Sequence, residues 1–186
     1  MSGLGFQYMV LLPVYARDIL HAGPRGFGLL VSAFGLGSLL SAILMTRKLT
    51  RWDLRRNLLV GLTAAGLGMG CFAWSRIFSL TLAMGFASGF GLILYVASTN
   101  TLLQITTEDR FRGRIMGLYT FMFIGTAPAG ALLSGWVAQH FGAPTATSLS
   151  SLVLLAGALW VLYRLRALAA RESAQLTEPV PIDKLG

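Results

Sequence analysis

The chain has 186 residues, of which 55% are hydrophobic and only 12% are charged, and its mean hydropathy is +0.68. Soluble domains carry about 25% charged residues, so this composition excludes an ordinary soluble domain and, with 22 glycines, is typical of a polytopic membrane protein. One cysteine, Cys71, excludes an internal disulfide and a cysteine-based zinc site. The two histidines form no ligand pair, so neither a metal nor a cofactor is expected.

Six apolar segments follow one another along the chain, and runs of about 20 such residues cross a bilayer as helices. Their approximate ranges are 3–16, 26–45, 58–74, 77–103, 115–138 and 145–163. The polar residues 171–186 contain two prolines and predict a disordered cytoplasmic tail. The predicted fold is therefore an all-α integral membrane bundle of six helices within residues 1–170.

The first apolar segment is short. Only 16 residues precede Arg17, or about 24 Å of helix, and no basic residue stands before it. We therefore expect a truncated first helix and a chain that is a piece of a longer protein.

The net charge of +8 comes from basic residues placed between the apolar runs, which indicates orientation in a membrane and not nucleic-acid binding. All of the 15 lysines and arginines except Arg17, Arg25 and Arg76 fall on one side of the predicted bundle. Because basic loops stay in the cytoplasm, we expect loops 46–57 and 104–114 and both termini to be cytoplasmic. The expected location is the plasma membrane, which is the inner membrane in bacteria.

The fifth segment carries the strongest local signal, because the charged run EDRFRGR at 108–114 directly precedes the uncharged residues 115–138. Pro128 removes a backbone hydrogen bond and predicts a kink. One face of the segment carries aromatic and small residues, for which close helix packing and a substrate-lining surface are the two interpretations. The residues of this face are Tyr119, Phe123, Thr126, Gly130 and Ser134.

Several of these stretches resemble one family. The runs LPVYARDIL at 12–20, GPRGFGLLVSAFGLG at 23–37 and the segment 108–138 are similar to the C-terminal six-helix half of major facilitator superfamily transporters. Within that superfamily the resemblance is nearest to the enterobactin-exporter type and to drug-efflux members. The run TRWDLRR at 50–56 resembles the family's acidic-then-basic loop, although Thr46 and Leu54 stand where the family has glycines.

The resemblance implies a cytoplasmic gate, in which arginines bind carboxylates or helix ends across an interface that opens and closes. Anchoring of a basic loop at an anionic leaflet is the alternative interpretation. The gate candidates are Arg51, Asp53, Arg55, Arg56, Arg112 and Arg114.

Polar residues within the spans are candidates for a substrate pathway, because lipid offers them no partners. Hydrogen bonding between helices is the alternative interpretation for each. The candidates are Gln7, Tyr8, Tyr95, Asn100, Tyr119 and Thr126. No Asp, Glu, Lys, Arg or His lies in the middle of a span, so the chain offers no intramembrane proton relay of the usual kind.

The resemblance implies half of a secondary active transporter that exports a small molecule, a drug or a siderophore by alternating access. Its expected partners are the lipid bilayer, the substrate, and either the missing N-terminal six-helix half or a second copy, with no nucleic acid. A rhomboid-type intramembrane protease is the alternative, but Ser134-Gly135 lacks the Gly-x-Ser-Gly context and His140 lies at the far helix end, so no enzyme is expected. A non-transporting membrane subunit is a further alternative.

Overall fold

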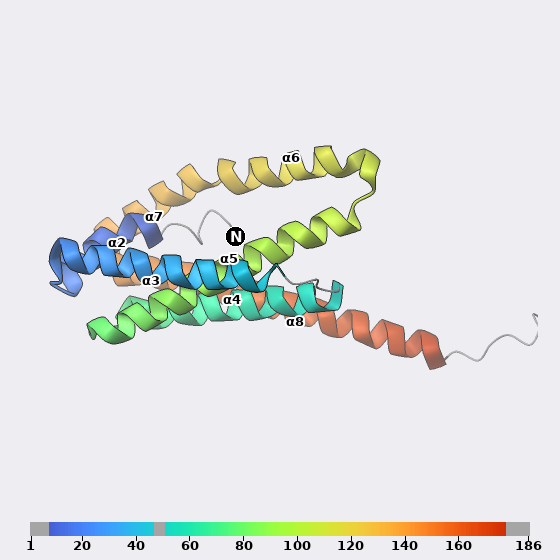
Figure 1. Cartoon of the computed structure of the whole chain (residues 1–186), viewed down its shortest axis with the longest axis horizontal. Helices are drawn as coiled ribbons and strands as arrows, with labels where there is room; N and C mark the ends of the chain where they lie inside the picture. The colour runs from blue at the N-terminus through green and yellow to red at the C-terminus, as the bar shows by residue number, and fades with distance from the viewer. Residues whose placement is uncertain (1–7, 47–50, 178–186) are drawn as a thin grey trace, which may run out of the picture.

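The structure, a computed structural model, describes residues 8–46 and 51–177, with side chains for 9–46 and 53–167. Within these ranges the chain is a bundle of helices without a strand, as Figure 1 shows. The elements are α2 (Tyr8–Val14), the π-helix η1 (Tyr15–Ile19), α3 (Gly23–Leu44), α4 (Arg51–Trp74), α5 (Phe78–Thr106), α6 (Asp109–Gly125), α7 (Ala127–Phe141) and α8 (Ala143–Thr177). Among the described residues, five stretches are long and apolar enough to cross a membrane. The predicted all-α membrane bundle is confirmed.

The helix α5 lies between α3 and α4 and approaches both backbones closely, because glycines face each other at the crossings. A Cβ atom on Gly37 of α3 would lie 2.1 Å from the Phe86 carbonyl oxygen, and one on Gly89 of α5 would lie 2.2 Å from the Phe34 carbonyl oxygen. Small residues permit such contacts between membrane helices. The hydroxyl of Ser38 adds a hydrogen bond to the Gly89 carbonyl, at 3.3 Å.

The core lies where the start of the chain meets α3, α4 and α8. The ring of Phe72 packs against Tyr15 and Phe34, with centroid distances of 4.8 and 5.7 Å. The Tyr15 hydroxyl is buried and donates to Thr147 Oγ1 at 3.0 Å and to the Ala73 carbonyl at 3.4 Å. These bonds tie η1 to α4 and α8, which come from distant parts of the sequence.

The first apolar segment is not one regular helix. Its α-helical part ends at Val14, and the five residues of η1 follow with a wider turn, in which the Leu20 amide donates to the Tyr15 carbonyl at 2.9 Å. Pro13 precedes this change and lacks the N–H group that a regular ladder needs. Such wide turns frequently mark functional sites in helices.

The fifth apolar segment is broken at Thr126, between α6 and α7, two residues before Pro128. Only α7 is anchored in the bundle, through the buried Gly130 and Ser134. No residue of α6 is buried, and Figure 1 shows this helix running apart from α3, α4 and α5. The break therefore separates an anchored half from a half that has no buried residue.

One helix end differs from the sequence prediction. The helix α8 continues to Thr177, beyond the predicted start of the tail at residue 171. Alanine, leucine, arginine and glutamate are strong helix formers, which explains the extension.

Candidate functional site

The facing surfaces of α5 and α6 bring two of the predicted pathway residues together. Tyr119 is half-buried although its helix has no buried residue, and it lies near enough to Tyr95 of α5 for an electrostatic interaction. The Tyr119 ring also stacks on Phe123 of its own helix, at 5.8 Å between centroids. Tyr95 packs its other side against the core.

The polar groups of Asn100 and Thr126 bind within their own helices. Asn100 Oδ1 accepts a hydrogen bond from Gln104 Nε2 at 2.9 Å, and the Thr126 hydroxyl donates to the Met122 carbonyl at 2.8 Å. Similarly, Thr99 Oγ1 donates to the Tyr95 carbonyl at 2.8 Å. Hydroxyl groups in helices commonly bond in this way. These contacts satisfy the polar groups without using a neighbouring helix.

The remaining pathway candidates fall at the start of the chain. Gln7 lies outside the described residues. Tyr8 begins α2, but its side chain lies outside the described part.

The gate candidates occupy the starts of α4 and α6, which lie at the same end of the bundle (Figure 1). Arg112 pairs with Asp109 within the first turn of α6, at 2.7 Å between Nη2 and Oδ1. Arg114 and Arg55 are exposed to solvent. The structure thus gives Arg112 a partner in its own helix and not one on α4.

Two other gate candidates, Asp53 and Arg56, line a cavity of about 310 Å³ between α3, α4 and α5. The side chain of the neighbouring candidate Arg51 lies outside the described part. The cavity was not predicted, because its walls come from three segments that are far apart in the sequence.

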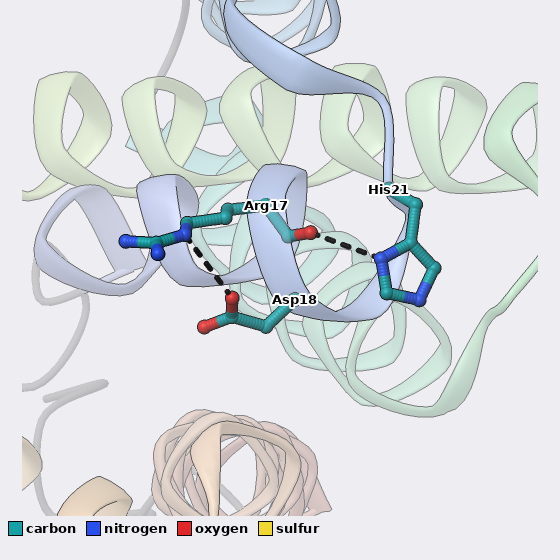
Figure 2. A network of polar contacts seen from close by, with 3 residues as sticks. All are labelled: Arg17, Asp18 and His21. Atoms are coloured by element: carbon teal, nitrogen blue, oxygen red, sulfur yellow. Dashed lines mark hydrogen bonds and ion pairs between the residues drawn. The ribbon is translucent and has the colours of Figure 1, made fainter.

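A polar group that sequence reasoning did not identify lies at the opposite end of the bundle. Arg17 and Asp18 form an exposed ion pair at 3.6 Å, and Nδ1 of His21 lies 3.2 Å from the Arg17 carbonyl oxygen (Figure 2). Asp18, His21 and Arg76 line a cavity of about 220 Å³, together with Trp74. The only sequence signal for this group was that Arg17 and Arg76 depart from the majority side of the basic residues.

This arrangement defines a class: a polytopic helical membrane protein with charged helix starts gathered at one end. The sequence profile of the Major Facilitator Superfamily matches residues 1–185. The chain belongs to the Major Facilitator Superfamily.

Two relatives are similar over most of this chain. The multidrug efflux pump Tap of Mycolicibacterium fortuitum is 30% identical over 164 residues, which is 86% of this chain and 39% of the pump. The uncharacterized MFS-type transporter YuxJ of Bacillus subtilis strain 168 is 29% identical over 168 residues, which is 87% of this chain and 42% of YuxJ. The chain thus spans about two fifths of the length of these curated relatives. No solved structure matches significantly.

The protease alternative has no support in the geometry. Ser134 is buried and His140 is exposed, and their positions on α7 point to different faces. The His140 Nδ1 atom lies 2.9 Å from the Trp136 carbonyl oxygen of its own helix. A nucleophile and its base need hydrogen-bond contact. The family match indicates transport instead of catalysis.

Proposed function

We propose that the chain forms one six-helix half of a secondary active transporter that exports a small molecule by alternating access. The name of the Mycolicibacterium relative, a multidrug efflux pump, supports a drug-like substrate. In this family mechanism two helical halves rock against each other around a central site. The partner of this chain would be a complementary six-helix half or a second copy.

The observation that carries this proposal is the packing of α6. This helix is apolar enough to form part of a membrane span, yet none of its residues is buried. Phe121, Leu118 and Ile124 are 74%, 60% and 64% exposed, respectively. Tyr119 lies near Tyr95 of α5, and its ring stacks on Phe123 of its own helix. A helix that carries a tyrosine near α5 and leaves its apolar side chains uncovered fits the wall of a cavity shared with a second half.

The charged helix starts fit a gate on the cytoplasmic side, with both termini in the cytoplasm. Asp53 and Arg56 of α4 lie at the same end as Arg112 and Arg114 of α6. In one state of the transporter these groups would dock on the facing half, and in the other state they would separate. The Arg112–Asp109 pair in the present structure would exchange partners during this change.

A reconstitution experiment tests the proposal. We expect proteoliposomes that contain only the 186 residues to show no saturable efflux of a cationic dye. Adding a complementary six-helix half, fused or as a separate chain, should produce efflux. In that assembly Tyr95→Ala should reduce efflux more than Tyr163→Ala, which alters an exposed tyrosine of α8 away from α5. Saturable efflux by a monomer of the 186 residues alone would overturn the proposal.

A further inference from the structure

The cavity between α3, α4 and α5 has walls of two kinds. Its apolar wall comes from all three helices and comprises Leu44, Met45, Val60, Phe90 and Leu94. Its polar residues are confined to the first turns of α4 and comprise Asp53, Arg56 and Asn57. The volume of about 310 Å³ falls at the lower end of the roughly 300–1,000 Å³ range of ligand sites.

Part of the apolar wall lies further along the helix axis than the polar residues, whereas Leu44 and Met45 end α3 at the level of Asn57. Asp53 and Arg56 belong to the first turns of α4, so the polar group lies near the end of this apolar helix. Val60 follows Arg56 by one turn, or about 6 Å further into the bilayer. Leu94 and Phe90 continue the apolar wall on α5, which runs in the opposite direction. The cavity therefore changes from charged to apolar in the same direction as the membrane does.

The donors at the polar end fit a phosphate group. Arg56 is exposed, and its guanidinium can bind two phosphate oxygens at once. The Asn57 amide makes only a 3.9 Å contact with the Met45 sulfur, a weak acceptor, and its second N–H group is left for a ligand. Both side chains lie on the same wall of the cavity.

We propose that this cavity binds a membrane glycerophospholipid, with its phosphate on Arg56 and Asn57 and an acyl chain along Val60, Phe90 and Leu94. The order of charged and apolar walls matches the order of head group and chain in a lipid. A soluble phosphate compound would leave the apolar wall uncovered, and a phosphate-free lipid would leave Arg56 without a ligand. The proposal depends on the membrane location of the chain and not on its transport activity.

Native mass spectrometry of the purified chain in non-ionic detergent tests this site, with phosphatidylglycerol as the probe. We expect one retained lipid per chain. Arg56→Gln should weaken binding about tenfold, because hydrogen bonds to a charged group contribute about 1.5 kcal/mol or more. Val60→Trp should weaken binding similarly by filling the cavity.

Two control variants match these changes in the same helix. Arg55→Gln removes the adjacent charge, but Arg55 does not line the cavity. Leu67→Trp adds the same indole two turns further along α4, where Leu67 is 54% exposed and outside the cavity. Both controls should bind lipid within about twofold of the parent chain. Arg56→Lys, which keeps a point charge, should retain intermediate binding if Arg56→Gln does not fold.

Four outcomes would overturn the proposal. Equal weakening by Arg55→Gln and Arg56→Gln would indicate diffuse surface charge. Equal binding of diacylglycerol would show that the phosphate is not recognised. Competition by glycerol 3-phosphate at equal concentration would indicate a site for soluble phosphate. Loss of dimers in Val60→Trp, with an unchanged lipid count, would identify a second copy as the occupant.

Discussion

The contact between α3 and α5 yields the most direct prediction of the structure. Replacing Gly37 with alanine places a methyl group 2.1 Å from the Phe86 carbonyl oxygen and 2.9 Å from the Phe90 amide nitrogen. Both atoms belong to backbone, so no side chain can rotate away. The two helices must separate by more than an ångström before the methyl group reaches an ordinary contact of 3.4 Å.

The expected magnitude follows from two opposing terms. Overpacking of a well-packed contact costs about 1–3 kcal/mol, and this separation also weakens the contact between Gly89 and Phe34. Alanine gains at most about 1 kcal/mol over glycine in helix propensity. We expect Gly37→Ala to lower the free energy of unfolding by about 1–2 kcal/mol. The control Gly35→Ala, on the same helix with nothing within 4 Å of its Cβ position, should be neutral or stabilising.

The measurement is SDS-induced unfolding in mixed micelles, followed by intrinsic tryptophan fluorescence. The double variant Gly37→Ala/Gly89→Ala provides a further check, because helices already separated by the first methyl group leave more room for the second. Its loss should be smaller than the sum of the single losses. Equal stability of Gly37→Ala and Gly35→Ala would refute the close backbone contact.

Three other predictions concern the core, the topology and the gate. Tyr15→Phe should lower the free energy of unfolding by about 1 kcal/mol in the same SDS titration. In a Thr147→Val background the same substitution should lower the free energy of unfolding measurably less. An equal loss in both backgrounds would mean that the two hydroxyls do not interact. In a variant with Cys71 replaced by serine, cysteines introduced at Arg55 and Arg76 should react with impermeant maleimide from opposite sides of the membrane. Labelling of both positions from the same side would disprove the proposed orientation. Asp53→Ala in the assembled transporter should reduce efflux at unchanged expression, as measured by dye transport and immunoblot, whereas full efflux would leave Asp53 without a gating role.

The candidate site could be predicted only in part from the sequence. Tyr95 and Tyr119 were identified as polar residues within spans, and the structure places them near each other. Asn100 was identified by the same argument, but its amide oxygen binds Gln104 one turn along the same helix. Residue type shows that a polar group needs a partner, whereas the rotation of each helix decides where the partner lies.

The sequence by itself determined the properties that depend on neighbouring residues. The apolar runs indicate membrane helices because transfer of each run into lipid depends on its own composition. The break near Pro128 also follows locally, since proline cannot complete the helical hydrogen-bond ladder.

Only the tertiary structure decided which segments meet. The bond from Tyr15 to Thr147 crosses 132 positions, and the cavity of Arg56 and Phe90 joins separate helices. The exposure of α6 likewise has no counterpart in its sequence. These features depend on the fit between helix surfaces, such as the glycines of α3 and α5, and hydrophobicity alone does not encode that fit because lipid is as apolar as the helices.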